Sequence, residues 1–209
     1  MAIEQVSLAE LKAELAKTRV TRGIQEVVVH HTWSPTAVQY QGKATWEAIR
    51  RYHTGERGWS DIGYHYGVGP DGTLWKLRPV TRSGAHVLNR NQHTVGVVLL
   101  GNFDVEDPAR CGLPRMVELV RMLVERFRLP PAGIRFHREF QNKTCPGTKL
   151  DLGAFRKMVA APAAAQPCQT AATRTIMIVD HETVQEVGRF ELVANGDHIK
   201  DQGKVYVKQ

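Results

Sequence analysis

The sequence predicts an α/β fold for most of the chain, followed by a small β-rich module. Short apolar runs that suit strands alternate with segments whose apolar residues recur at helical spacing. A Gly-Pro-Asp-Gly cluster at residues 69–72 separates two such runs, which is typical of a β-hairpin. With 209 residues and 42% hydrophobic content, the chain is long enough to bury one substantial core.

Four segments are predicted to be helical. The pattern is strongest in residues 113–129, where Pro130 then prevents continuation of the helix. Asp151 suits the N-cap of the last helix because its carboxylate can accept a hydrogen bond from a free backbone amide. The expected helices are residues 8–17, 46–53, 113–129 and 151–159.

Four runs in the first 160 residues are predicted to be strands. Residues 95–100 are apolar throughout and lie between Thr94 and Gly101, the pattern of a strand that is covered on both faces. The expected strands are residues 27–30, 64–68, 73–77 and 95–100.

The C-terminal part of the chain has a different composition. Residues 161–173 are rich in Ala, Pro, Gln and Thr and show no core pattern, so they are predicted to link a domain at residues 1–160 to a module at residues 174–209. The module contains short β-branched runs that are predicted to be strands, at residues 175–179, 189–193 and 204–207, separated by turn residues. No motif in it identifies a function.

The charge of the chain favours anionic surroundings. The net charge is +7 and the sequence pI is about 9.5. Residues 110–149 contain nine Lys or Arg against three Asp or Glu. This region either contacts anionic envelope polymers such as teichoic acid or lipopolysaccharide phosphate, or is a solvated helix face. Nucleic-acid binding is not expected, because no basic motif with interleaved aromatic residues is present.

Targeting and disulfide signals are weak. The first 20 residues lack the apolar core of a signal peptide, and no stretch is long enough to span a bilayer, so synthesis in the cytoplasm is expected. Three cysteines are too few for a disulfide framework, although a bridge between Cys111 and Cys168 stays open.

His30, His137 and Cys145 form a candidate zinc-binding set. His30 ends an apolar run, and the seven residues between His137 and Cys145 make a loop long enough to direct both side chains to one point. Two imidazoles and a thiolate leave the fourth tetrahedral position of zinc open, as in catalytic sites. His31 is an alternative ligand, but adjacent strand residues point to opposite faces, so only one of the two histidines can reach the metal.

Several ordered motifs resemble one enzyme family. They are VVVHHT at 27–32, DIGYHY at 61–66, GPDG at 69–72, GAH at 84–86, TVGVVLLGNF at 94–103, HRE at 137–139 and KTCPG at 143–147. Together they resemble the zinc-dependent N-acetylmuramoyl-L-alanine amidases, which include phage lysozyme-amidases and peptidoglycan recognition proteins. The resemblance covers about residues 30–147 and implies a central mixed β-sheet flanked by helices.

The resemblance also implies a reaction and a ligand set. The expected reaction is hydrolysis of the peptidoglycan amide between the lactyl group of N-acetylmuramic acid and L-alanine of the stem peptide. The expected Zn²⁺ ligands are His30, in preference to His31, with His137 and Cys145. Zinc lowers the pKa of a bound water to near 7 and polarises the carbonyl oxygen.

Other motif residues receive expected roles from the same resemblance. Tyr64 and Lys143 are the catalytic candidates that stabilise the oxyanion or protonate the leaving amine, and the sequence does not divide these roles. His86 and Trp33 are substrate-binding candidates. Glu139 is expected to hold His137 or its loop. Each has a structural alternative: a core aromatic for Tyr64, a solvated lysine for Lys143, a satisfied buried histidine for His86 and a packed sheet-edge tryptophan for Trp33.

Three functional hypotheses follow from the resemblance. The first is a zinc amidase that hydrolyses peptidoglycan, as a phage or prophage endolysin that waits in the cytoplasm, or as a bacterial autolysin or recycling amidase. The second is a module that recognises muropeptides without cutting them, and Cys145 argues against it because non-catalytic relatives typically lack this cysteine. The third is a structural role in a phage particle, which depends on the C-terminal module. The position of residues 174–209 after a linker suggests that this module binds the cell wall or mediates self-association, and a passive cap is the equal alternative.

Overall fold

The computed structural model describes residues 2–109 and 112–162, together with the backbone of four C-terminal strands. The chain divides into two compact units, residues 1–168 and 169–209, which are treated separately below. Cys111 and Cys168 lie outside the described residues, as does most of the expected linker. Within the described part, no helix has both the length and the apolar character needed to cross a membrane.

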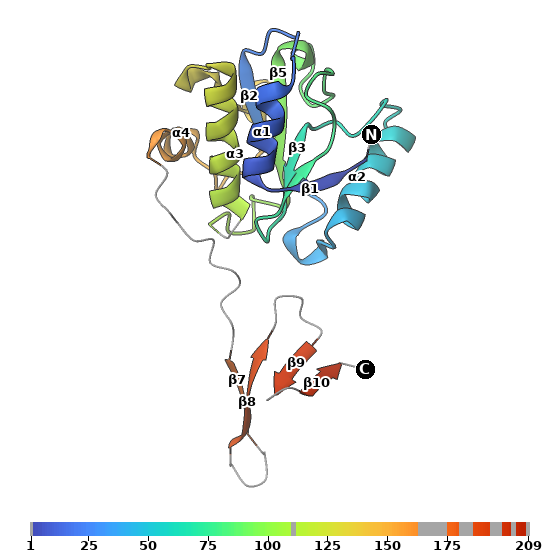
Figure 1. The fold of residues 1–209 in the computed structure, drawn as a ribbon, viewed down its shortest axis with the longest axis vertical. Helices are drawn as coiled ribbons and strands as arrows, with labels where there is room; N and C mark the ends of the chain where they lie inside the picture. The colour runs from blue at the N-terminus through green and yellow to red at the C-terminus, as the bar shows by residue number, and fades with distance from the viewer. Residues whose placement is uncertain are drawn as a thin grey trace. The chain divides into compact units, whose positions relative to one another are not determined.

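A mixed six-stranded sheet forms the centre of the first unit (Figure 1). Strands β3, β5, β2 and β6 are parallel to one another, whereas β4 is antiparallel to both β3 and β1. The predicted central mixed sheet is therefore confirmed. In spatial order the strands are β1 (Glu4–Val6), β4 (Leu74–Lys76), β3 (Tyr66–Val68), β5 (Thr94–Leu99), β2 (Glu26–His31) and β6 (Ile134–Phe136).

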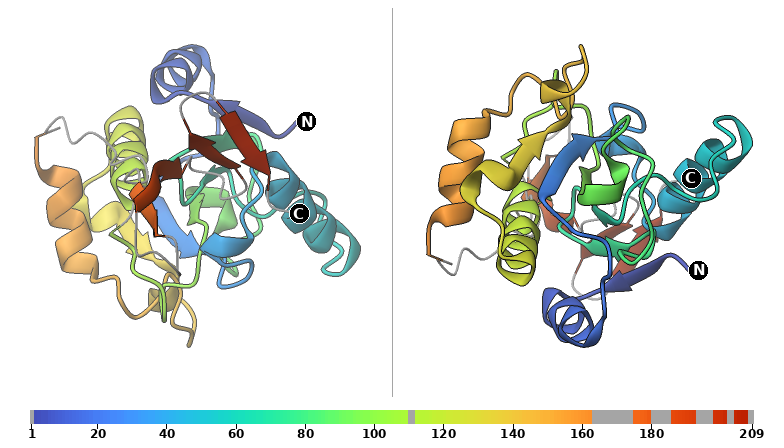
Figure 2. Two further views of the ribbon diagram at one scale, coloured as in Figure 1. Left: turned by 90° about the horizontal axis from the view of Figure 1, so that it is seen from below. Right: turned by 90° about the horizontal axis from the view of Figure 1, so that it is seen from above.

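Helices cover both faces of this sheet (Figure 2). Helices α1 (Leu8–Lys17), α3 (Gly112–Phe127) and α4 (Leu152–Ala160) pack on one face, where they share a buried apolar cluster with the odd-numbered residues of β2 and β5. Helix α2 (Lys43–Gly55) covers the other face through Trp46 and Ile49. His30 belongs to the α2 face, because it alternates with Val29 along β2.

Local sequence explains where the helices begin and end. Ser7 and Glu10 form a capping box at the start of α1, and Asp151 accepts a hydrogen bond from the Ala154 amide at the start of α4. Helix α3 ends at Phe127 rather than at residue 129 as predicted, because Arg128 adopts the left-handed conformation with φ 53°.

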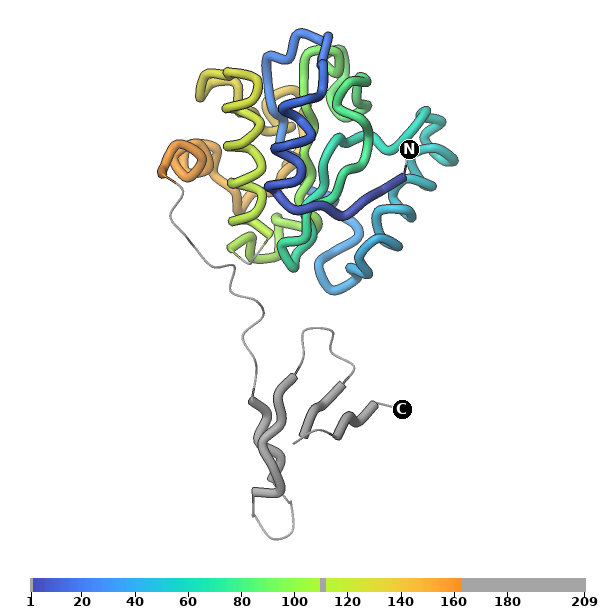
Figure 3. Tube along the Cα trace, viewed as in Figure 1, coloured from blue at the N-terminus to red at the C-terminus, as the bar shows by residue number. Residues whose placement is uncertain are grey.

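Several elements differ from the sequence prediction. Strands β1, β6 and β9 were not expected, because runs of three or four residues show too little periodicity. The predicted strand at 64–68 shortens to β3, although the carbonyls of Tyr64 and His65 still accept hydrogen bonds from Arg78 and Leu77. Figure 3 traces the path of the chain through the first unit. The described residues of this unit also include four short 3₁₀ segments, which are η1 (Ala37–Gln39), η2 (Asn91–His93), η3 (Pro131–Gly133) and η4 (His137–Glu139).

The second unit contains a four-stranded antiparallel sheet in the order β10, β9, β8, β7. The sequence-predicted runs 175–179 and 204–207 coincide with β7 and β10, and the run 189–193 overlaps β8. The bounds are β7 (Thr175–Val179), β8 (Glu186–Leu192), β9 (His198–Asp201) and β10 (Lys204–Val207). Cell-wall binding or self-association by this unit stays a prediction.

Candidate metal centre

The three predicted zinc ligands meet at one edge of the sheet. His30 is near the C-terminal end of β2, and His137 follows directly after the neighbouring parallel strand β6. Because adjacent parallel strands end at the same sheet edge, the two imidazoles lie side by side there, and the following loop brings in Cys145. Their candidate ligand atoms all lie within 4.8 Å of one another, and within the described part of the chain no other group of His, Cys, Asp or Glu is arranged in this way.

The geometry of the three side chains fits a thiophilic divalent cation. All three are buried, and Sγ of Cys145 lies 3.6 Å from Nδ1 of His30. The ring centroids of His30 and His137 are 4.5 Å apart. Nε2 of His137 is buried without a hydrogen-bond partner among the described residues, which is costly unless a ligand satisfies it. Two imidazoles and one thiol are a donor set typical of zinc.

The protonation states also suit a metal site. Burial, followed by the charge of Lys143, lowers the pKa of His137 to about 4. Burial together with the neighbouring His86 and His137 lowers the pKa of His30 as well. Both imidazoles are therefore neutral at pH 7 and can donate a lone pair. Burial raises the pKa of the Cys145 thiol to about 12, so its deprotonation requires a bound cation.

His31 occupies the opposite face of β2. Its Nδ1 accepts a hydrogen bond of 3.2 Å from the Phe103 amide, and its ring lies 6.1 Å from the Phe103 ring. The structure therefore places His30, and not His31, with His137 and Cys145.

The loop that carries Cys145 is fixed by residues that the sequence did not reveal. Asp104 accepts hydrogen bonds from the Thr144 hydroxyl at 2.7 Å and from the Thr148 amide at 2.8 Å. The Arg138 amide donates to the Cys145 carbonyl at 2.8 Å. Asp104 is 40 residues away from Thr144 along the chain, and no spacing or periodicity in the sequence connects them.

Glu139 stabilises the turn that leads into His137, in agreement with its expected supporting role. Its carboxylate accepts a hydrogen bond of 2.7 Å from the Phe136 amide, directly before His137. It also forms an ion pair of 2.9 Å with the guanidinium of Arg135. These contacts fix the turn from β6 into η4, so they orient the backbone from which the His137 side chain extends.

Tyr64 and Lys143 lie beside the three donors. The Tyr64 ring is 5.2 Å from the His30 ring, centroid to centroid, and burial raises the pKa of its hydroxyl. His53 also packs against Tyr64, with ring centroids 5.7 Å apart. Lys143 is exposed, and its positive charge contributes to the lowered pKa values of His30 and His137.

The two predicted substrate-binding residues have different environments. Trp33 directly follows β2 and Thr32, is 62% exposed, and has a left-handed backbone with φ 60°, which is rare for a bulky residue. His86 is buried, and both of its ring nitrogens have partners inside the protein: His30 at 3.0 Å and Thr94 at 3.2 Å. Substrate contact by either residue stays a prediction.

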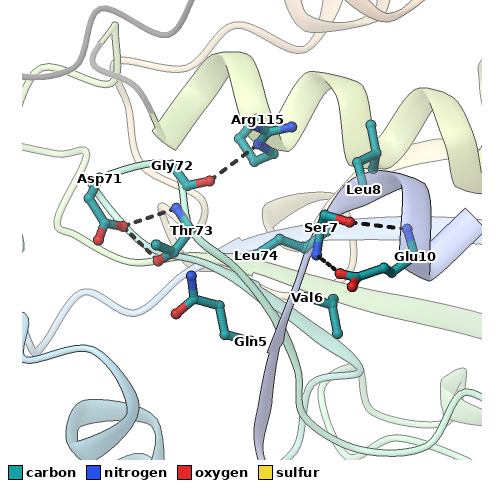
Figure 4. Close-up of a pocket in the computed structure, with 10 residues that line it drawn as sticks. All are labelled: Gln5, Val6, Ser7, Leu8, Glu10, Asp71, Gly72, Thr73, Leu74 and Arg115. Atoms are coloured by element: carbon teal, nitrogen blue, oxygen red, sulfur yellow. Dashed lines mark hydrogen bonds between the residues drawn. The ribbon is translucent and has the colours of Figure 1, made fainter.

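A separate pocket of about 440 Å³ lies between the end of β1, the start of α1, the β3–β4 turn and α3 (Figure 4). Its polar groups largely serve the fold: Ser7 and Glu10 cap α1, Asp71 binds Thr73, and Arg115 donates to the Gly72 carbonyl. None of the residues that line this pocket is among the predicted site residues.

Comparison with known proteins identifies relatives of the first unit. Residues 20–148 match the family model described as N-acetylmuramoyl-L-alanine amidase. Peptidoglycan-recognition protein LB of Drosophila melanogaster is 34% identical over 128 residues, which cover 59% of this chain and 55% of that protein. The human N-acetylmuramoyl-L-alanine amidase is 32% identical over 127 residues, which cover 58% of this chain and only 22% of that protein.

A solved structure gives the same result for the fold. The Ph2119 endolysin from the Thermus scotoductus MAT2119 bacteriophage Ph2119 superposes with a TM-score of 0.56 and 27% identity, over 68% of this chain and 88% of that one. The fold, the motif order and the buried His-His-Cys group agree with the matched family model. The chain therefore belongs to the N-acetylmuramoyl-L-alanine amidase family, to which the peptidoglycan-recognition proteins are related.

Proposed function

We propose that this chain is a zinc-dependent peptidoglycan hydrolase that cleaves the amide between the lactyl group of N-acetylmuramic acid and the first L-alanine of the stem peptide. The observation that carries this proposal is the buried group of His30, His137 and Cys145 with Tyr64 directly beside it. A recognition module that only binds muropeptide has no need for three buried metal-binding donors next to a phenolic hydroxyl.

His30, His137 and Cys145 would hold the zinc ion. When bound at such a donor set, zinc supplies Lewis acidity and a water of pKa near 7. The remaining work belongs to residues of the chain around this site. They must orient the scissile amide, stabilise the charge that develops on its carbonyl oxygen, and return a proton to the leaving amine.

Tyr64 is suited to stabilise the oxyanion. Burial raises its pKa, so the hydroxyl stays protonated at neutral pH and can donate a hydrogen bond. The ring packs against both His30 and His53, so its position is restricted before substrate arrives. A preorganised donor of this kind contributes roughly 10²- to 10³-fold to the rate when it faces a developing oxyanion.

Lys143 is suited to add positive charge at the open side of the site. It is exposed, two residues before Cys145, and its charge is felt by the buried imidazoles. In this position its ammonium can attract the substrate, favour negative charge on the reacting carbonyl, and donate a proton to the leaving amine. Tyr64 thus donates a hydrogen bond from a packed position, whereas Lys143 supplies a positive charge on a flexible side chain.

Trp33 is suited to contact the glycan or peptide beside the site. Its exposed indole and strained backbone directly follow the strand that carries His30. An exposed aromatic face can stack on a sugar ring or on apolar stem-peptide atoms. The cost of the left-handed conformation argues that its placement serves binding rather than packing.

The biological setting that we propose is lysis of a bacterial cell wall by a phage or prophage endolysin. The structural similarity to the Ph2119 endolysin supports this setting. The enzyme would be made in the cytoplasm and would act on the wall, and its basic charge would favour anionic envelope polymers. An autolysin or recycling amidase remains the alternative within the same chemistry.

A recognition protein that binds muropeptide without cleavage is the second candidate. The 34% identity to a peptidoglycan-recognition protein favours it as the competing hypothesis. The two hypotheses separate on a single property, because only the enzyme releases new L-alanine amino termini from purified peptidoglycan.

The test measures this release while reducing sugars are followed in parallel. Metal-stripped, zinc-restored and Cys145→Ala proteins are compared. We expect amine release that depends on zinc, is lost in Cys145→Ala, and occurs without new reducing sugars. Muropeptide binding without amine release from the zinc-restored protein would assign the chain to the recognition class.

Two matched pairs of variants test the catalytic roles. Tyr64→Phe should reduce kcat by roughly 10²- to 10³-fold with zinc content unchanged, whereas Tyr52→Phe on the exposed face of α2 should have no effect. Lys143→Ala should lower activity more than Lys157→Ala, a lysine in the last turn of α4. Equal activities within either pair would contradict the corresponding role.

A further inference from the structure

His30 is connected by hydrogen bonds to a series of three groups, which are the His86 ring, the Thr94 hydroxyl and the Arg90 carbonyl. Nε2 of His30 is 3.0 Å from Nδ1 of His86, and Nε2 of His86 is 3.2 Å from the Thr94 hydroxyl. That hydroxyl donates to the backbone carbonyl of Arg90 at 3.1 Å. The side chains of His30, His86 and Thr94 are all buried, so the two hydrogen bonds that His86 makes are shielded from water.

The carbonyl at the end of this series determines the direction of every hydrogen bond in it. A carbonyl oxygen can only accept, so the single hydroxyl hydrogen of Thr94 is committed to Arg90. Thr94 must then accept from Nε2–H of His86, which leaves Nδ1 of His86 as an acceptor. His30 must in turn donate through Nε2–H, and its lone pair therefore lies on Nδ1, the atom 3.6 Å from Cys145 Sγ.

This assignment requires that His86 carries no charge. The His86 ring is buried, and both of its ring nitrogens have partners inside the protein. A neutral imidazole supplies the one donor and the one acceptor that the series needs, whereas a buried imidazolium would offer His30 no acceptor.

Two glycines leave the space that the His86 ring occupies. A Cβ atom at Gly96 would lie 2.6 Å from Cδ2 and Cγ of His86, and one at Gly84 would lie 2.6 Å from Cδ2. Any other residue at either position would displace the ring. Gly96 lies on β5 directly beside β2, so the missing side chain creates the space in which His86 reaches His30 across the sheet.

We propose that His86 and Thr94 are positioning residues that hold His30 in its Nε2-protonated tautomer and so direct its Nδ1 lone pair toward the metal site. This inference rests on the proposed zinc site but not on amidase catalysis. It assigns His86 to the support of a ligand in place of contact with substrate. Groups that orient a metal-binding histidine in this way typically change metal affinity by roughly 10- to 100-fold.

Thr94 offers a test that alters the series without disturbing the histidines. Thr94→Val preserves the shape of the side chain but removes the acceptor for His86, which is then free to reverse its tautomer and that of His30. Thr94→Ser keeps the hydroxyl. We expect the Kd for Zn²⁺, measured by competition with a chromophoric chelator at pH 7.5, to rise about 10-fold in Thr94→Val and to stay within about threefold of wild type in Thr94→Ser.

Thr45→Val is the control for loss of a buried threonine hydroxyl elsewhere. Thr45 is also buried, and its hydroxyl accepts a hydrogen bond from the Gln41 amide. It should leave the Kd for Zn²⁺ unchanged. Equal zinc affinities in Thr94→Val, Thr94→Ser and wild type would overturn the proposal.

A second measurement reads the tautomer directly in the metal-free wild-type protein and does not depend on any variant folding. Long-range ¹H–¹⁵N spectra of the imidazole rings should show His30 and His86 protonated at Nε2. Protonation of His30 at Nδ1 would refute the proposed series even if zinc binds. A wild-type protein that does not bind zinc would overturn the metal site itself, so the two failures are distinguishable.

Discussion

Acid should destabilise this protein through buried histidines, and His53 offers the clearest case. Burial, followed by the charges of Arg57 and Arg78, lowers the pKa of His53 from 6.5 to about 4. Its Nδ1 accepts a hydrogen bond of 3.2 Å from the Gly63 amide, and its ring packs against Tyr64. Protonation would remove this acceptor and place a charge beside the proposed catalytic tyrosine.

The sign and size of the effect follow from linkage between protonation and folding. Because the folded pKa lies below the unfolded value, the unfolded state takes up the proton first as pH falls. The stability contribution of neutral His53 is therefore complete above pH 6.5 and is lost between pH 6.5 and about 4. A pH of 4.5 lies two pH units below 6.5, and each unit corresponds to about 1.4 kcal/mol of unfolding free energy. The protein therefore loses roughly 2–3 kcal/mol of unfolding free energy through His53 at this pH.

The experiment replaces His53 with Asn, whose Oδ1 can still accept from Gly63 but does not titrate. Urea unfolding of the metal-free wild type and of His53→Asn is measured at pH 7.5 and pH 4.5. His65 and His137, with pKa values of about 3 and about 4, destabilise both proteins at acid pH. The decrease in unfolding free energy should nevertheless be about 2–3 kcal/mol smaller in His53→Asn.

The control is His93→Asn, which changes an exposed histidine and should leave the pH dependence as in wild type. The absolute stability of His53→Asn is also expected to fall, because the ring contacts with Trp59 and Tyr64 are lost. Only the difference between the two pH values tests the reasoning. An identical pH dependence in wild type and His53→Asn would show that His53 is not held neutral by burial.

Three further predictions concern packing, metal and domain organisation. Gly67→Ala should lower the unfolding free energy by about 1–3 kcal/mol in urea titrations, because the new Cβ would lie 2.7 Å from the buried Trp46 ring. Gly23→Ala is the control and should leave the unfolding free energy unchanged, because its Cβ would meet no atom within 4 Å. Removal of the metal by a chelator should lower Tm. Free Zn²⁺ at about 1,000 times its Kd should then raise the unfolding free energy by roughly 4 kcal/mol, and a Tm that does not respond to zinc would contradict the site. A chain ending at Pro162 should keep zinc binding and cleavage of soluble muropeptides while losing activity on intact walls, and loss of zinc binding on this truncation would show that the two units are not independent.

Much of the fold could be predicted because the relevant signals are local. Helix α1 was predicted with its observed bounds, since its apolar spacing and the residues around it mark both ends. The hairpin between β3 and β4 followed from its turn residues in the same way. Strands β1 and β6 escaped prediction because three residues carry almost no periodic signal, and they exist only through pairing with β4 and β2.

The sequence by itself determined which residues gather at the metal site. The motif order, the position of His30 at the end of an apolar run and the seven-residue spacing between His137 and Cys145 predicted the three donors. The tertiary structure decided what orients them: His31 faces away, Asp104 fixes the Cys145 loop, and Thr94 acts on His30 through another histidine. The physical reason is that the ligands lie in short motifs that can be recognised along the chain, whereas their hydrogen-bond partners come from segments that only folding brings together.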